Sequence, residues 1–122
     1  MILIVDDDPI FLGSATTALT AKDERVLCAQ SATRALDLVK KIGSEFGLAL
    51  IDLDLPDTNG FQLISMIKTL DEKLPVIAIS EVFSDTALDS SKAFGAQETL
   101  RKPISDQWRV AIARLRRRPS NQ

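Results

Sequence analysis

The sequence opens with Met1-Ile2-Leu3-Ile4-Val5-Asp6-Asp7-Asp8, a short apolar run that ends in three carboxylates. An apolar run of this length with β-branched members is typical of a strand buried on both faces of a parallel sheet. Carboxylates gathered at the end of such a strand repel one another, and a hard cation with oxygen ligands, such as Mg2+, relieves that repulsion. Asp8-Pro9 is a good helix start, so we expect Asp8 to cap a helix and treat Asp6 and Asp7 as candidate metal ligands.

The composition limits the kinds of function to consider. A chain of 122 residues with 45% hydrophobic content forms one domain with a sizeable core. A net charge of −2 gives no general case for nucleic-acid binding. Because the chain has no histidine, zinc sites and catalysis by Ser-His or Cys-His pairs are excluded.

The single cysteine, Cys28, excludes an intramolecular disulfide. It lies in the apolar stretch 26–29 and is expected to be an inert core residue. The chain has no apolar run of membrane-spanning length, and no signal peptide precedes the first strand. We therefore expect a cytoplasmic protein that does not enter a membrane.

Short apolar runs alternate with longer amphipathic ones along the whole chain. The pattern predicts strands at about 2–6, 26–30, 47–52, 75–80 and 97–100, and helices at about 9–21, 32–42, 60–70, 85–94 and 105–117. Five strand–helix units in strict alternation indicate an α/β fold with a parallel sheet covered on both faces. In open sheets of this type, the ligand site lies beyond the carboxyl ends of the strands.

Several single residues fit this pattern. Ser31 and Ser84 can cap the second and fourth helices. Gly60 is expected at the start of the third helix, either for a positive φ or for close packing. The first helix is expected to bury Phe11, and Trp108 on the last helix is expected to anchor the core or an interface.

Polar side chains follow four of the predicted strands. Asp6 and Asp7 end the first strand, Asp52 ends the third, Ser80 ends the fourth, and Lys102 follows the fifth. This combination suits phosphoryl transfer, in which the Asp52 carboxylate attacks phosphorus and forms an acyl phosphate. Mg2+ held by Asp6 and Asp7 would neutralise the phosphate oxygens, Lys102 would supply a point charge, and Ser80 would donate a hydrogen bond. Catalysis of this kind needs positioning and charge neutralisation but no general base.

Five motifs occur in a fixed order along nearly the whole chain: Val5-Asp6-Asp7-Asp8-Pro9, Asp52-Leu53-Asp54-Leu55-Pro56-Asp57, Gly60, Ser80 and Lys102-Pro103. Together they resemble the receiver domain of two-component response regulators, including the stand-alone chemotaxis type. The resemblance implies a flavodoxin-like, doubly wound five-stranded parallel sheet with strand order 2-1-3-4-5 and five helices. It also implies a phosphoacceptor switch and not an enzyme, with only self-catalysed phosphoryl transfer and slow autodephosphorylation.

The resemblance also implies residue roles. Asp52 would be the phosphoacceptor, Ser80 the switch hydroxyl and Lys102 the phosphate contact, and the Lys102-Pro103 peptide bond is often cis in the family. The implied Mg2+ ligands are Asp7 directly, Asp6 partly through water, Asp52, and the backbone carbonyl of Asp54.

The implied partners are a histidine kinase or a histidine phosphotransfer protein as phosphodonor. Phosphorylation would switch a surface formed by residues 85–94, 97–100 and 105–117, through which a homodimer could also form. The receiver domain would span 1–118, with 119–122 as a tail or the start of a linker. The chain could be a stand-alone regulator with a downstream protein target, or a receiver cut from a protein with an output domain. No direct nucleic-acid binding by this domain is expected.

The chain departs from the family pattern at a few positions. Thr99 replaces the usual Tyr or Phe and is expected to be an exposed strand residue, so that the aromatic readout is absent or altered. Glu81 replaces a small residue after the switch hydroxyl and either slows phosphorylation or points to solvent. Asp54 and Val82 occupy positions that tune attack by water, and an intermediate to long acyl-phosphate lifetime is expected.

Two alternative functions are open from the sequence. A phosphorylation-independent receiver that acts as a protein-interaction domain is supported only by Thr99 and Glu81. Asp52-Leu53-Asp54 also resembles the nucleophile motif of haloacid-dehalogenase-like phosphatases. In those enzymes, however, the motif follows the first strand, whereas here it follows the third.

Overall fold

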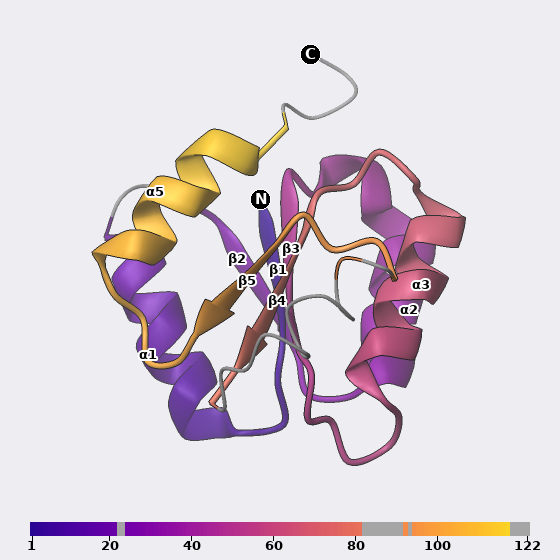
Figure 1. The fold of residues 1–122 in the computed structure, drawn as a ribbon, viewed down its shortest axis with the longest axis horizontal. Coiled ribbons are helices and arrows are strands. Elements are labelled where there is room, and N and C mark those ends of the chain that lie inside the picture. The colour runs from indigo at the N-terminus through magenta and orange to yellow at the C-terminus, as the bar shows by residue number, and fades with distance from the viewer. Residues whose placement is uncertain (22–23, 82–91, 93, 118–122) are drawn as a thin grey trace.

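A five-stranded parallel sheet forms the centre of the computed structural model, which describes residues 1–21, 24–81, 92 and 94–117 (Figure 1). The strand order is β2-β1-β3-β4-β5, as predicted. The strands are β1 (Ile2–Val5), β2 (Val26–Ala29), β3 (Leu48–Asp52), β4 (Val76–Ser80) and β5 (Glu98–Arg101).

The described helices cover both faces of this sheet. They are α1 (Pro9–Thr20), α2 (Ala32–Ile42), the short 3-10 helix η1 (Gly43–Glu45), α3 (Gly60–Leu70) and α5 (Asp106–Leu115). The predicted helix at 85–94 and its Ser84 cap lie outside the described residues, apart from Lys92 and Phe94. No helix in the described part of the chain is long and apolar enough to cross a membrane.

Alternate strand residues supply the two halves of the core. Helices α1 and α5 lie on one face of the sheet and α2 and α3 on the other (Figure 1). Ile2 and Ile4 pack in the core on the α1 and α5 side, whereas Leu3 and Val5 pack in the core on the α2 and α3 side. All four side chains are buried. Double-sided burial explains why β1 is a continuous apolar run, and it leaves the strand ends as the place for polar groups.

Two predicted helix caps are confirmed. The Asp8 carboxylate accepts a hydrogen bond from the Ile10 N–H at 2.9 Å, and the Ser31 hydroxyl accepts one from the Arg34 N–H at 3.1 Å. Each bond satisfies a backbone donor that has no partner within the first helical turn. These caps fix where α1 and α2 begin.

Two burial predictions are wrong. Cys28 is exposed, because β2 is an edge strand with β1 as its single neighbour in the sheet, and the Cys28 sulfur lies 3.4 Å from the Thr16 hydroxyl. Thr99 is only 7% exposed, so it is a core residue and not a surface residue. Its neighbour Leu100 packs toward α1 and α5, so Thr99 points to the other face of the sheet, which is also shielded from solvent at this position.

Gly60 serves close packing, one of its two predicted roles. Its φ is not positive, and a Cβ built on it would lie 2.5 Å from both the Asp52 carbonyl oxygen and Leu53 Cα. The start of α3 therefore rests directly on the backbone at the end of β3.

We expect Gly60→Ala to destabilise the domain by about 2 kcal/mol, because backbone atoms must move to admit the methyl group. The control is Gly13→Ala, at an exposed position of α1 where a Cβ meets nothing within 4 Å. That change should stabilise the domain by about 1 kcal/mol through helix propensity. Urea denaturation of both variants measures the difference, and equal stabilities would contradict the packing argument.

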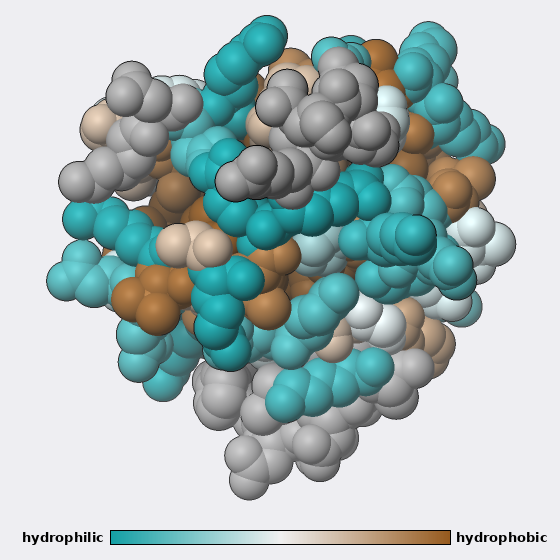
Figure 2. All heavy atoms as spheres, turned by 90° about the horizontal axis from the view of Figure 1, so that it is seen from above, coloured by the Kyte–Doolittle hydropathy of each residue, from teal (hydrophilic) through white to brown (hydrophobic). Residues whose placement is uncertain are grey.

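The end of the described chain is held by a second set of contacts, centred on Arg117. Its guanidinium pairs with both oxygens of Asp71 at 2.6 and 3.2 Å, and it donates to the carbonyl oxygens of Phe46 and Gly43. The Arg117 N–H donates to the Gly47 carbonyl at 2.9 Å. These contacts tie the segment after α5 to the amino-terminal end of β3. Figure 2 shows this end of the molecule, where hydrophilic side chains surround small hydrophobic patches.

We predict that Arg117→Ala lowers the free energy of unfolding at pH 7 by about 2 kcal/mol, since it removes a charged hydrogen-bond network. The hydrogen bond from Arg117 holds the pKa of Asp71 below its usual range. The stability that Asp71 contributes is therefore complete above an unfolded-state pKa of about 3.9, and it is lost as the pH falls through the lower folded pKa.

Chemical denaturation at pH 7 and at about pH 3 tests this prediction, because the gap between variant and wild type should narrow in acid. The matched control is Arg114→Ala, which breaks the exposed ion pair with Glu98 and should change stability by less than about 1 kcal/mol. A gap that is independent of pH would contradict the role given to Asp71.

Candidate functional site

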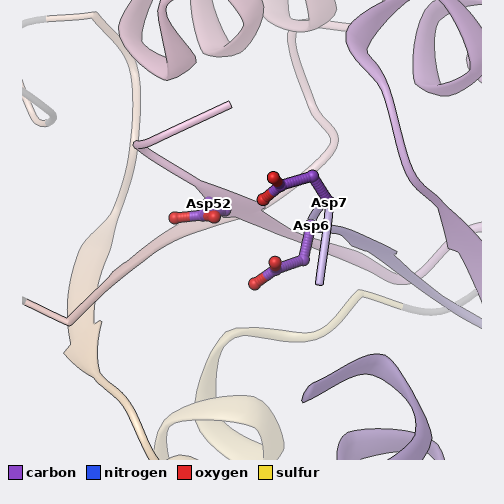
Figure 3. A group of neighbouring side chains, drawn as sticks. All are labelled: Asp6, Asp7 and Asp52. Carbon is purple, nitrogen blue, oxygen red and sulfur yellow. The ribbon is translucent and has the colours of Figure 1, made fainter. Parts of the chain in front are cut away.

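Three predicted carboxylates meet at the carboxyl edge of the sheet. Val5, the last residue of β1, pairs with Ile51 of β3, so Asp6 and Asp52 emerge side by side. Asp6, Asp7 and Asp52 each place one carboxylate oxygen within 4.8 Å of the others (Figure 3). Asp6 is fully buried, Asp52 is 3% exposed and Asp7 is exposed. The register of two adjacent strands thus creates the acidic pocket.

Lys102 is the cation of this pocket. Its Nζ lies 2.5 Å from Asp6 Oδ2 and 3.5 Å from Asp52 Oδ2. The Phe11 ring lies beneath the ammonium, 4.5 Å from Nζ to the ring centroid. The Lys102-Pro103 peptide bond is cis, as the resemblance implied. Two carboxylates and one aromatic ring therefore hold a single ammonium.

Ser80 lies next to this group, at the end of β4. It is 5% exposed and follows Ile79, which pairs with Asp52 across the two strands. Its carbonyl accepts the Lys102 N–H at 2.9 Å, so the serine and the lysine share one backbone contact. Glu81 is exposed, which favours the prediction that it points to solvent, and Val82 lies outside the described residues.

The pocket disfavours an ionised Asp52. Burial raises the pKa of Asp52, and the charges of Asp6 and Asp54 raise it further. The Asp54 N–H, which donates to Asp52 Oδ1 at 3.1 Å, and the Lys102 charge act in the opposite direction without cancelling the effect. Burial lowers the pKa of Lys102, but Asp6 and Asp52 outweigh it and raise that pKa above its usual value. Lys102 therefore stays protonated, but its single positive charge does not balance the negative charges of the surrounding carboxylates.

The donor set fits a divalent cation. Asp6 Oδ1 accepts the Asp8 N–H at 2.9 Å. Asp6 Oδ2 is buried, and its partner among the described residues is the Lys102 ammonium, 2.5 Å away. Three carboxylates that meet within 4.8 Å, two of them buried, supply the oxygen ligands that Mg2+ and Ca2+ prefer.

The Asp54 carbonyl remains a predicted ligand. Asp54 lies two residues after Asp52 in the chain. Its side chain is exposed, and its backbone N–H donates to the Asp52 carboxylate. Sequence reasoning placed Phe11 in the core and missed its contact with Lys102. Its position one helical turn after the acidic run could have indicated a place at the site.

The comparison with known families agrees with this geometry. The family described as response regulator receiver domain matches residues 2–114. The chain therefore belongs to the receiver domain family of two-component response regulators.

Individual relatives share this assignment. The chain is 32% identical over 103 residues to the two-component response regulator ARR10 of Arabidopsis thaliana. The matched stretch covers 84% of this chain and 18% of that protein. A receiver domain protein (CheY-like) from Methanospirillum hungatei is similar at 29% identity with a TM-score of 0.84, covering 93% of this chain and 91% of that one. The chain thus spans less than a fifth of the length of the first curated relatives that it matches.

A response regulator from Burkholderia pseudomallei, solved with a phosphorylated aspartic acid, a calcium ion and citrate, shares the fold. It is 24% identical with a TM-score of 0.81, covering 90% of this chain and 64% of that one. Receiver domains are phosphorylation-based signalling switches that bind a divalent metal at an acidic pocket and work with histidine kinases or phosphotransfer proteins. The fold and this functional class agree with the sequence-based prediction.

We predict that Asp52→Asn stabilises the metal-free domain at pH 7 by about 1 kcal/mol, the scale on which two like charges 4 Å apart interact in water. Because the folded pKa of Asp52 is raised, its ionisation opposes folding at neutral pH. That cost declines as the pH falls through the raised pKa toward the unfolded value, so the gain from Asn should shrink in acid.

Thermal unfolding in EDTA between pH 4 and pH 7 measures this gain. The control is Asp54→Asn, whose exposed side chain should matter less. An Asp52→Asn variant that is less stable than the wild type at pH 7 would refute the electrostatic account.

Proposed function

We propose that this domain accepts a phosphoryl group on Asp52 from the phosphohistidine of a histidine kinase or phosphotransfer protein. The observation that carries the proposal is the meeting of Asp6, Asp7 and Asp52 within 4.8 Å, with the Lys102 ammonium between Asp6 and Asp52. Belonging to the receiver family supports the same reading.

The chemistry is a phosphoryl transfer from a histidine nitrogen to a carboxylate oxygen. An oxygen of the Asp52 carboxylate attacks phosphorus, the P–N bond to the donor histidine breaks, and the imidazole nitrogen keeps the electron pair and takes up a proton from solvent. Asp6, Asp7, Asp52 and the Asp54 carbonyl would hold Mg2+, which neutralises the phosphoryl oxygens when bound. The protein needs no general base, because Asp52 attacks as a carboxylate.

Lys102 and Ser80 would then contact the phosphoryl group. Lys102 is protonated and already lies 3.5 Å from Asp52, so it can exchange that carboxylate for a phosphoryl oxygen. Ser80 ends the neighbouring strand and can donate its hydroxyl to another oxygen. Since residue 99 is a buried threonine, no aromatic ring moves at that position, and the switch relies on backbone motion after Ser80.

The larger context stays a proposal. We expect a receiver domain over 1–118, with 119–122 as a tail or linker, in a cytoplasmic protein. The surface that phosphorylation switches would bind a downstream protein target, an output domain elsewhere in the protein, or a second copy of the domain. The β5–α5 groove, which Arg101, Asp106 and Arg114 line, would form part of that surface.

One alternative retains a structural argument. Thr99 removes the usual aromatic readout, which is compatible with a receiver that acts as a protein-interaction domain without phosphorylation. The pocket nevertheless keeps its carboxylates and its lysine. The family match over residues 2–114 argues against the haloacid-dehalogenase alternative.

We predict that acetyl phosphate with Mg2+ adds one phosphoryl group per chain, and that the label persists for minutes or longer. Asp52→Asn and EDTA should each abolish the label. Lys102→Met should slow labelling about 100-fold, since it removes a charge that the transferring group meets. Phos-tag electrophoresis and intact-protein mass spectrometry measure the label.

The matched control is Asp37→Asn on the solvent side of α2, which should label like the wild type. A domain that folds and yet fails to label, or to bind beryllofluoride with Mg2+, would favour the phosphorylation-independent function. Steady release of phosphate from a phosphomonoester would contradict both.

A further inference from the structure

A hydrogen bond joins the loop after Asp52 to a helix that carries no site residue. Asp57, in the loop between β3 and α3, accepts the backbone N–H of Ala32 with both carboxylate oxygens, at 3.2 and 3.1 Å. Ala32 is the first residue of α2, 25 positions away in the sequence. N–H groups in the first turn of a helix have no partner inside it, so this donor is free to bind another segment.

The loop at residues 53–59 is also held at both ends. At its start, the Asp54 N–H donates to Asp52 Oδ1 at 3.1 Å. At its end, the Gly60 N–H donates to the Leu53 carbonyl, and the Asn59 side chain accepts the Phe61 N–H at 2.7 Å. The bond from Asp57 to α2 adds an anchor in the middle of the loop.

Capping of α2 alone does not account for this bond. Ser31 already caps the helix by accepting the Arg34 N–H. The helix is a firm support, because Ala32 and Ala35 are buried in the core beside the sheet. A carboxylate at the positive end of a helix dipole is also favourable, and this strengthens the anchor.

We propose that Asp57 is a positioning residue for the phosphoacceptor site. It holds the loop against α2, so that the Asp52 carboxylate and the Asp54 backbone keep the geometry that a divalent cation requires. This inference rests on the proposed function in one respect, namely that Asp52 and Asp54 contribute to a Mg2+ site. Groups that orient metal ligands typically change metal affinity strongly when they are removed.

The test compares variants at the contact between the loop and the start of α2. NMR of 15N-labelled protein measures their Mg2+ affinity and the exchange of the Asp54 amide with solvent. Asp57→Ala removes the anchor, Asp57→Asn keeps an acceptor oxygen, and Ser31→Ala removes the other cap of the same helix without touching the loop. Ala32→Pro removes the donor from the opposite side, and proline is well tolerated at the first position of a helix. It also serves as the second route to the answer if Asp57→Ala folds poorly.

We expect Asp57→Ala and Ala32→Pro to raise the Kd for Mg2+ about tenfold. Asp57→Asn should restore most of the affinity, and Ser31→Ala should bind Mg2+ like the wild type although its melting temperature falls. Without Mg2+, the Asp54 amide should exchange with solvent several-fold faster in Asp57→Ala than in Ser31→Ala.

Equal Mg2+ affinity and equal Asp54 exchange in Asp57→Ala and Ser31→Ala would overturn the inference and leave Asp57 as a second helix cap. The amide exchange is measured without metal, so it decides the role of Asp57 even if the wild type fails to bind Mg2+. That failure would instead reject the proposed function.

Discussion

The structure depends on the charge balance at the carboxyl edge of the sheet. Asp6 and Asp52 are almost wholly removed from water, and Lys102 is the ammonium that contacts them both. One cation facing two buried carboxylates leaves the site short of positive charge, and the exposed Asp7 adds to the deficit. Buried charge is costly unless it is paired. The unbalanced charge at the site therefore lowers the free energy of unfolding of the domain when no metal is bound. A bound cation relieves the same deficit that the fold creates.

The topology makes this deficit unavoidable. The helices bury β1 on both faces, and its pairing with β3 brings its last residue beside Ile51, so residues 6 and 52 share one edge of the sheet. Polar groups cannot lie inside such a strand, and the acidic run therefore begins where the apolar run ends. Gly60 and the loop anchors then bring the start of α3 against the backbone of Asp52.

The sequence predicts features that depend on a local residue pattern. It does not predict contacts between residues that lie far apart along the chain. Strand ends, the Asp8 cap and the residues of the acidic pocket follow from apolar runs and from the rule that places ligands at strand termini. Exposure of Cys28 depends on β2 lying at a sheet edge, which a short apolar run does not reveal. The bond between Arg117 and Asp71 joins polar residues 46 positions apart, and that of Asp57 with Ala32 joins residues 25 apart. Neither an ion pair between distant residues nor a bond to a backbone N–H leaves a periodic signal in the sequence.

If Asp52 is phosphorylated as proposed, the contacts of the Lys102 ammonium explain how the site could act as a switch. Lys102 lies between Asp6 and Asp52 over the Phe11 ring, and its backbone N–H is bound to the Ser80 carbonyl. A ligand shifts a conformational equilibrium only by the difference in its interaction with the two states. Asp6 and Asp52 now share Lys102 as a donor. A phosphoryl group on Asp52 would present new anionic oxygens, and it would thus change what both Lys102 and Ser80 contact. Because these residues lie on β4 and directly after β5, the change begins on the two strands farthest from β2.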